Sequence, residues 1–79
     1  MHCNVPQIDM DATGLNIHAL RVSNNYKVVD IQDIFDFNTP QAIYKWESGR
    51  ALPTIENLLA LSRIFGCPIE QIIVLKGEN

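Results

Sequence analysis

Residues 38–53, NTPQAIYKWESGRALP, contain the signals for a short helix closed by a turn. Thr39 is a good N-cap, and Pro40 suits the first position of a helix. Gly49 favours the left-handed conformation that ends one. We therefore predict a helix over residues 40–48. Its two sides would differ, with Ala42, Ile43 and Trp46 on an apolar side and Gln41, Tyr44 and Lys45 on a polar side.

The composition around this stretch is that of one small globular domain. The 79 residues are 47% apolar and 19% charged, which is enough for a modest core. Two cysteines, Cys3 and Cys67, are too few for a disulfide framework, so we expect reduced thiols in a cytoplasmic protein. The chain has no signal-peptide pattern and no apolar run of membrane-spanning length, so we expect no membrane partner.

Two helices are predicted before residue 38. The first lies near residues 11–22 with Thr13 as its N-cap. Its apolar contacts would be Leu15, Ile17, Ala19 and Leu20. The second covers residues 28–35, although its β-branched residues also permit a strand. Its apolar face would contain Val28, Ile31, Ile34 and Phe35.

Two more helices are predicted after residue 53. In the first, over residues 55–65, Thr54 is the N-cap and Gly66 ends the helix. Its buried face would consist of Ile55, Leu58, Leu59, Leu61, Ile64 and Phe65. A short fifth helix over residues 68–75 has more apolar residues than a small core can hold, which favours a homodimer interface over plain exposure. That interface would contain Ile69, Ile72, Ile73 and Leu75.

The helices over residues 28–35 and 40–48, joined by a short turn, suggest a helix-turn-helix motif. Over roughly residues 10–75 the sequence also resembles the phage-repressor type of helix-turn-helix domain, the Cro and CI-repressor class. The residues that carry this resemblance are Ala42, Ile43, Lys45, Trp46, Glu47, Gly49 and Pro53.

The resemblance implies an all-α, five-helix bundle of the lambda-repressor-like type without a cofactor. We expect a flexible arm over residues 1–9, the domain over residues 10–75 and a frayed end over residues 76–79. The implied function is a small bacterial or phage-type transcriptional regulator that binds double-stranded DNA and blocks or recruits polymerase. No effector domain is recognisable in these 79 residues, so we expect control by concentration, a partner or dimerisation.

In the fold that the sequence resembles, the second motif helix enters the major groove. Gln41 would then pair with adenine, Lys45 with guanine, and Tyr44 with a thymine methyl or a phosphate. The plain alternative is a solvated helix face. The predicted phosphate contacts are Thr39, Ser48, Arg50 and Lys27.

The resemblance also implies a largely shielded ion pair between Arg21 and Glu47. Desolvation offsets the attraction of such a pair, so it would orient the second motif helix more than it would stabilise the fold.

Several residues depart from the family pattern. Val28 stands where a polar residue commonly opens the first motif helix, and Asp36 stands where the turn usually has Gly. The turn is also one residue longer than the commonest form. If they face DNA, the carboxylates of the acidic residues would repel phosphates. These residues are Asp30, Asp33 and Asp36.

Other functions have little support in the sequence. The His and Cys residues lack metal-ligand spacing, and no catalytic motif is recognisable, so we expect neither a metal site nor an enzyme. These residues are His2, Cys3, His18 and Cys67. The net charge of −3 argues against a purely electrostatic nucleic-acid binder but permits a local basic face. It also favours an alternative, a protein-interaction module such as an antitoxin or anti-repressor adaptor on the same fold.

Overall fold

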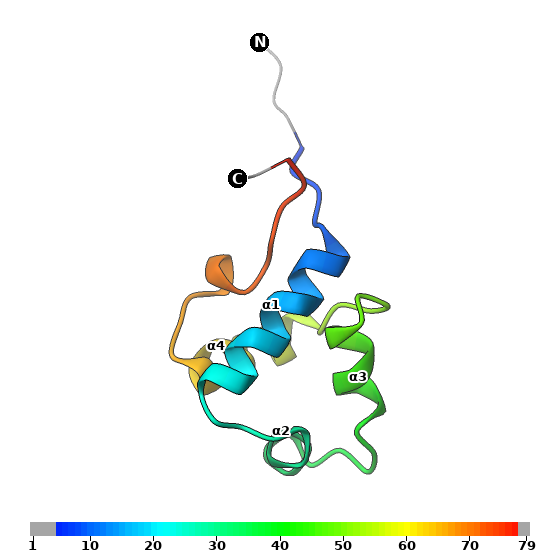
Figure 1. Ribbon diagram of the computed structural model, residues 1–79, viewed down its shortest axis with the longest axis vertical. Helices are drawn as coiled ribbons and strands as arrows, with labels where there is room; N and C mark the ends of the chain where they lie inside the picture. Colours follow the sequence, from blue (N-terminus) through cyan, green and yellow to red (C-terminus); the bar gives the residue numbers. More distant parts are fainter. Residues whose placement is uncertain (1–4, 78–79) are drawn as a thin grey trace.

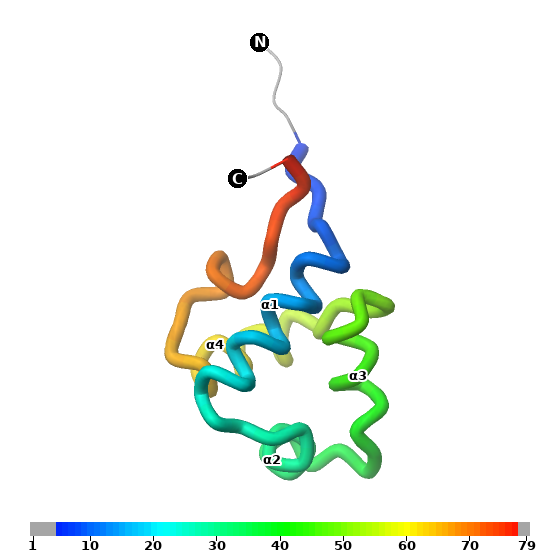
Figure 2. Tube along the Cα trace, viewed as in Figure 1, coloured from blue at the N-terminus to red at the C-terminus, as the bar shows by residue number. Residues whose placement is uncertain are grey.

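The computed structural model describes residues 5–77. Some predictions fall outside this range. They concern His2 and Cys3, part of the arm predicted over residues 1–9, and part of the frayed end predicted over residues 76–79. Figures 1 and 2 show α1 running through the middle of the molecule, with α2, α3 and α4 around it. No described helix has the length and apolar character that crossing a membrane requires. The elements are α1 (Met10–Ser23), α2 (Val28–Phe35), α3 (Gln41–Glu47), α4 (Ile55–Phe65) and one turn of 3-10 helix, η1 (Ile69–Gln71).

All four α-helices and the segment after η1 contribute to one hydrophobic core. At one end of it, the Trp46 ring packs edge-on against Phe35 and Phe37, with centroid separations of 5.6 and 5.8 Å. These contacts fix α3 against α2 and the turn that joins them. The buried apolar side chains are Ile17, Ile31, Ile43, Trp46, Leu58, Leu61, Phe65 and Ile72.

Gly14 allows α1 and α3 to pack closely. Glycine weakens the interior of a helix, but here a Cβ atom would lie 2.6 Å from the carbonyl oxygen of Trp46 and 2.7 Å from that of Glu47. No ordinary side chain fits in this space. The C-terminal end of α3 is therefore held directly against the backbone of α1.

The predicted helix ends are correct for α4 and need correction for α1 and α3. Thr54 caps α4 by accepting a hydrogen bond from the Asn57 N–H at 3.2 Å, and Gly66 ends it in the left-handed conformation. Thr13 is not the N-cap of α1. Asp9 takes that role, accepting from the Ala12 N–H at 3.0 Å, because α1 begins one turn earlier than predicted.

At the start of α3, Pro40 occupies the N-cap position and the helix begins at Gln41. The Thr39 hydroxyl accepts a long hydrogen bond from the Gln41 N–H at 3.4 Å. The predicted N-cap is therefore one residue off, which is a usual uncertainty at a helix end.

Several residues predicted to lie in the core are exposed instead. Ile55, the most exposed of them, has 76% of its surface accessible. A core this small accepts only a narrow stripe from each helix, so apolar residues at the edges of the predicted faces remain outside. The exposed residues are Leu15, Ala19, Ile34, Ile55 and Leu59.

The predicted fifth helix is wrong: within residues 5–77, α-helix ends at Phe65 and only one 3-10 turn follows. The chain beyond η1 is extended and pairs antiparallel with the segment before α1. The Asp9 N–H donates to the Val74 carbonyl and the Lys76 N–H to the Gln7 carbonyl, both at 2.8 Å. Ile8 and Leu75 form the bridge between the two segments.

Side chains of α1 explain why this segment is not helical. The Asn16 amide donates to the carbonyls of Gln71 and Ile72 at 2.6 and 2.9 Å. The Thr13 hydroxyl accepts from the Val74 N–H at 2.9 Å. Backbone groups that a fifth helix would pair internally are therefore bonded to α1. The β-branched run from residue 72 to 74 also has low helix propensity.

The C-terminal dimer interface was predicted on this absent helix. Ile72 is 0% exposed and belongs to the core of its own chain, while Ile69, Ile73 and Leu75 are half-buried. Ile69 and Ile73 pack against the core. The apolar surplus that suggested an interface is thus largely used within the monomer.

Candidate nucleic-acid interface

The turn between α2 and α3 is held by its own backbone. Asp36 adopts a left-handed conformation with φ 57°, and its N–H donates to the Asp33 carbonyl at 3.1 Å. Gln32 encloses the turn, because its carbonyl and its side-chain amide both bond the backbone of Phe37. A left-handed residue explains the usual preference for Gly here, and Asp is among the residues that tolerate this conformation.

α3 has one buried and one exposed side, as the sequence predicts. Ile43 and Trp46 are buried, and Ala42 is half-buried between them. The polar side chains predicted to contact bases are all exposed. They are Gln41, Tyr44 and Lys45.

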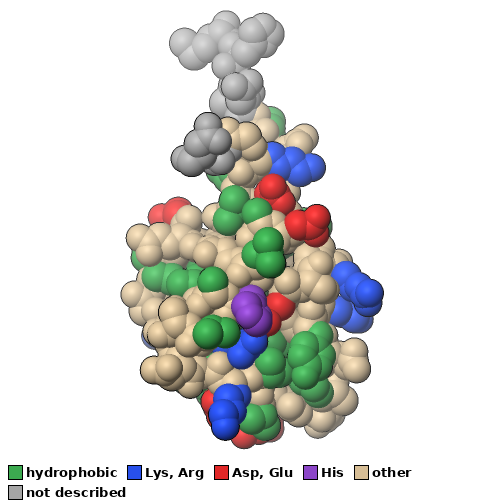
Figure 3. Space-filling view, in the orientation of Figure 1, with side chains coloured by type: hydrophobic (Ala, Val, Ile, Leu, Met, Phe, Trp, Pro, Cys, Tyr) green, Lys and Arg blue, Asp and Glu red, His purple; other side chains and the backbone are tan. Residues whose placement is uncertain are grey.

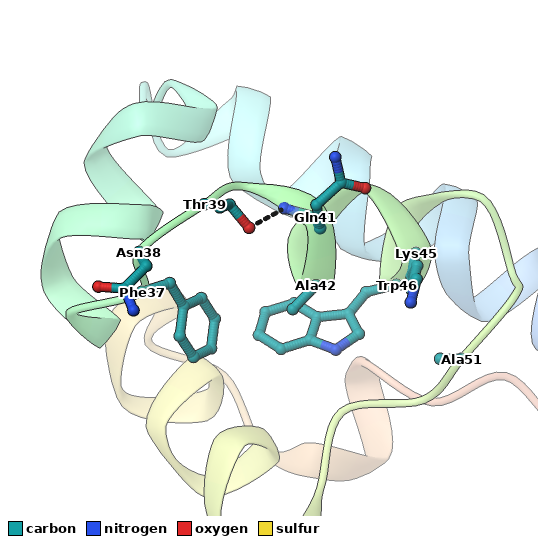
Figure 4. A pocket seen from close by; sticks show the side chains of 8 residues that line it. All are labelled: Phe37, Asn38, Thr39, Gln41, Ala42, Lys45, Trp46 and Ala51. Atoms are coloured by element: carbon teal, nitrogen blue, oxygen red, sulfur yellow. Dashed lines mark hydrogen bonds between the residues drawn. The ribbon is translucent and has the colours of Figure 1, made fainter.

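The exposed side of α3 borders a hollow of about 380 Å³, shown from close by in Figure 4. Gln41 and Lys45 both line this hollow, so the structure brings these two predicted base contacts together. Tyr44 is not among the lining residues. Its side chain is 53% exposed. The lining residues are Phe37, Asn38, Thr39, Gln41, Ala42, Lys45, Trp46 and Ala51.

The predicted phosphate contacts are all on the surface. Thr39, Ser48, Arg50 and Lys27 are exposed, and the Ser48 hydroxyl donates to the Lys45 carbonyl at 3.2 Å. Figure 3 shows Lys and Arg side chains beside the C-terminal end of α3. Among the residues that the structure describes, none of the cations near the motif forms an ion pair, so their charge is free to act on a ligand. These cations are Lys27, Lys45 and Arg50.

Arg21 and Glu47 form the expected contact between α1 and α3. Arg21 Nε lies 2.7 Å from Glu47 Oε2, Arg21 Nη2 lies 3.1 Å from Glu47 Oε1, and both side chains are 11% exposed. Arg21 Nη1 also donates to the Tyr26 carbonyl at 3.0 Å. This bidentate geometry fixes the C-terminal end of α3.

His18 joins this pair and was not predicted to do so. Its Nδ1 lies 2.7 Å from Glu47 Oε1 and 3.2 Å from Arg21 Nη2. A carboxylate only accepts hydrogen bonds, so a bond from Nδ1 to Glu47 requires the imidazole proton on Nδ1, and the Arg21 contact is then an approach of two donors and not a hydrogen bond. The signal was available in the sequence, since His18 and Arg21 are three residues apart and share a helix face.

The environment of Glu47 favours its charged form. Burial raises the pKa of this carboxyl, but the hydrogen bonds from Arg21 and His18 and the positive charge of Arg21 outweigh burial and leave the pKa below its ordinary value of 4.5. The hydrogen bond to Glu47 raises the pKa of Arg21. Glu47 is therefore an anion at neutral pH, as a lock between helices requires.

One of the three acidic residues near the motif has a structural partner. Asp30 Oδ2 accepts from the Lys27 N–H at 2.7 Å, at the start of α2 where the helix dipole favours an anion. Asp33 and Asp36 are exposed. The concern about repelling phosphates therefore applies mainly to these two.

Two short helices joined by a turn, the second with a free polar side, define a helix-turn-helix domain. Residues 17–72 match the helix-turn-helix family, and the chain belongs to that family, in its Cro and CI-repressor type. No curated protein matches the sequence.

Two solved structures share this fold. One is the crystal structure of the DNA-binding domain of BldD, and the other is the structure of the S. venezulae BldD DNA-binding domain. Each is 15% identical with a TM-score of 0.68 over 82% of this chain, and the matches cover 93% and 96% of those chains.

Proposed function

We propose that this chain is a sequence-specific DNA-binding regulator of transcription, with repressor-like action, that reads the major groove with α3. The observation that carries the proposal is the two-sided packing of α3. Its inner side is fixed by Trp46, Gly14 and the Arg21–Glu47 pair, while the polar side chains of its outer side are exposed. A helix held this rigidly can present side chains to base edges without first becoming ordered.

The chemistry of the outer side suits DNA. A Gln amide pairs with adenine and a Lys ammonium with guanine, so Gln41 and Lys45 are the proposed base contacts, with Tyr44 beside them. Arg50, Lys27, Thr39 and Ser48 are the proposed phosphate contacts. Bound over a promoter, such a domain blocks access of polymerase.

The proposal is tested by titrating the protein into DNA selected from a random pool, over a series of salt concentrations. We expect affinity to fall with salt and one sequence to be preferred. Lys45→Ala should weaken binding by about 1–3 kcal/mol at one base position only. Arg50→Ala should weaken all sequences alike and reduce the salt slope by about 1. Arg63→Ala, which removes an exposed cation from the last turn of α4, is the matched control. Equal affinity for all DNA sequences would contradict the proposal.

A second candidate is a protein-interaction module. The exposed carboxylates of Asp33 and Asp36 and the exposed apolar side chains of Val29 and Ile34 lie together on α2 and the turn that follows it. Such a surface suits a basic partner protein. A variant with Asp33→Asn and Asp36→Asn separates the two functions, because it should strengthen DNA binding and weaken a complex with a basic partner.

A homodimer remains part of the proposal. A symmetric pair would place two α3 helices about one turn of DNA apart on a near-palindromic site. Ile72 is excluded from such an interface because it is buried, whereas Leu75 and Ile69 are partly exposed.

A further inference from the structure

The hollow beside α3 has the size and shape of a small-molecule site. It lies between the turn before α3, the helix itself and Ala51 in the following loop (Figure 4). Its volume of about 380 Å³ falls in the range of roughly 300–1,000 Å³ that such sites occupy. Ala42 and Ala51 leave this space open, since a long side chain at either position would fill it.

Two aromatic rings form the apolar wall of the hollow. The centroids of Phe37 and Trp46 are 5.8 Å apart, with an angle of 67° between the ring planes. In Figure 4 the two rings stand beside each other, with Gln41 above the Trp46 ring and Lys45 to its right. Phe37 already stacks on Phe35 at a centroid distance of 5.2 Å and Trp46 is only 4% exposed, so a flat ring placed here meets the exposed edges of Phe37 and Trp46.

The polar groups of the hollow favour an anion. Lys45 is the single charged residue among those that line it, and no carboxylate faces it there. Trp46 is only 4% exposed, yet its indole N–H is not sealed from solvent and forms no hydrogen bond with another residue in 5–77. Asn38, Thr39 and Gln41 supply neutral polar groups at the rim.

From these features we infer that the hollow binds a small aromatic carboxylate. The aromatic ring packs against Phe37 and Trp46, and the carboxylate pairs with the Lys45 ammonium. Charge complementarity selects this class, because a cation would meet Lys45 without a counter-charge.

Binding in the hollow would also compete with DNA, an expectation that rests on the proposed function. Thr39, Gln41 and Lys45 line the hollow and are also proposed DNA contacts. A molecule seated among them occupies the groups that would reach the groove. By linkage, bound DNA would lower the affinity of the protein for the small molecule by the same factor by which the small molecule lowers the affinity for DNA.

The experiment is an NMR titration of the full chain with 2-naphthoate in the absence of DNA. Trp46 is the single tryptophan, so its indole N–H gives one resolved signal at the site. We expect saturable shifts of that signal and of the amides of Phe37 and Lys45, with a Kd on the order of 1 mM. 2-Naphthamide lacks the charge and cyclohexanecarboxylate lacks the aromatic ring, so each should bind at least about fivefold more weakly.

A variant that fills the hollow tests its location. Ala51→Leu should abolish the shifts, whereas Ala19→Leu, on the exposed side of α1, should leave them unchanged. If Ala51→Leu does not fold, Lys45→Gln serves instead, and it should remove the preference for naphthoate over naphthamide. The inference is wrong if no saturable shift occurs up to about 20 mM, if the amide binds as well as the acid, or if Ala51→Leu still binds.

DNA competition is measured separately. In a fluorescence-anisotropy assay, naphthoate should release DNA from the wild-type chain and not from a folded Ala51→Leu variant. Saturable NMR shifts with a chain that binds no DNA would leave the ligand site standing and overturn the proposed function. Shifts together with DNA affinity that naphthoate does not change would overturn the competition.

Discussion

At the scale of single residues, Asp36 is expected to lower both the stability of the fold and the affinity for DNA. Its left-handed backbone is unfavourable for a residue with a Cβ atom, and its exposed carboxylate is in the turn that leads to the proposed DNA contacts on α3. We expect Asp36→Gly to stabilise the fold by about 0.5–1 kcal/mol in urea denaturation and also to increase DNA affinity.

Asn25→Gly is the control for the effect at Asp36, because Asn25 has a similar φ of 64° without a charge. It should raise stability and leave DNA affinity unchanged. If Asp36→Gly stabilises the fold without improving DNA binding, the carboxylate points away from the phosphates.

Glu47 makes stability depend on pH. Its folded pKa lies below the ordinary 4.5, so it contributes stability that is present above about pH 4.5 and is lost as pH falls through the folded value. Glu47→Gln should therefore be less stable at neutral pH and lose less stability on acidification. Urea midpoints between pH 7 and about pH 3 measure this, with exposed Glu56→Gln as control. Parallel curves for Glu47→Gln and the wild-type chain would show that the lock contributes nothing.

The pair of Arg21 and Glu47 also shows how much of the site the sequence could predict. Arg21 and Glu47 were expected to pair because the resemblance pairs those positions, and the contact is present at 2.7 Å. His18 was missed because its role depends on the tertiary position of α3, although its spacing from Arg21 was visible. Asp9 was missed as a cap because Asp and Thr are both common N-cap residues, and the sequence pattern placed the start of α1 one turn too late.

At the scale of elements, the extended segment after η1 depends on α1. Thr13 is 0% exposed, and its hydroxyl satisfies the Val74 N–H. Thr13→Val keeps the shape of the side chain and leaves that N–H without a partner, so it should cost about 1–3 kcal/mol. Hydrogen exchange at Val74 should accelerate more than exchange in α4.

Ser23→Ala is the control for Thr13→Val because it removes an exposed hydroxyl of the same helix. It should change stability by less than about 0.5 kcal/mol. Equal effects of the two substitutions would contradict a specific role for Thr13.

This segment is also the element that sequence patterns could not predict. The apolar residues in 68–75 correctly predict that this segment is partly buried. An apolar pattern by itself does not distinguish a short helix from an extended segment. The outcome was decided by side chains of Thr13 and Asn16, more than fifty residues earlier in the chain. The other four helices were predictable because the spacing of their apolar residues agreed with the final packing, although the N-caps of α1 and α3 were not predicted correctly.

At the scale of the whole molecule, the positive charges near the helix-turn-helix motif differ from the acidic net charge of the chain. The chain has a net charge of −3, yet within residues 5–77 Lys27, Lys45 and Arg50 form no ion pair, while the charge of Glu47 is compensated by Arg21. The local field at α3 can therefore favour an anionic ligand even though the whole chain is acidic. The acidity that argued against DNA at the level of composition is a weaker objection once the ion pairs are known.

The last prediction concerns assembly. The paired segments over residues 7–9 and 74–76 lie together at one end of the molecule, with Leu75 partly exposed (Figure 1). If two copies join through this end, sedimentation should show an average mass that rises with concentration toward twice that of one chain. Leu75→Lys should hold the chain as a monomer and halve the length of its DNA footprint, whereas Val29→Lys on α2 should leave the mass unchanged. A single-chain mass at every concentration, free and on DNA, would mean that each copy reads its site alone. Specificity would then rest on one α3 helix, and affinity for an operator would not depend on its symmetry.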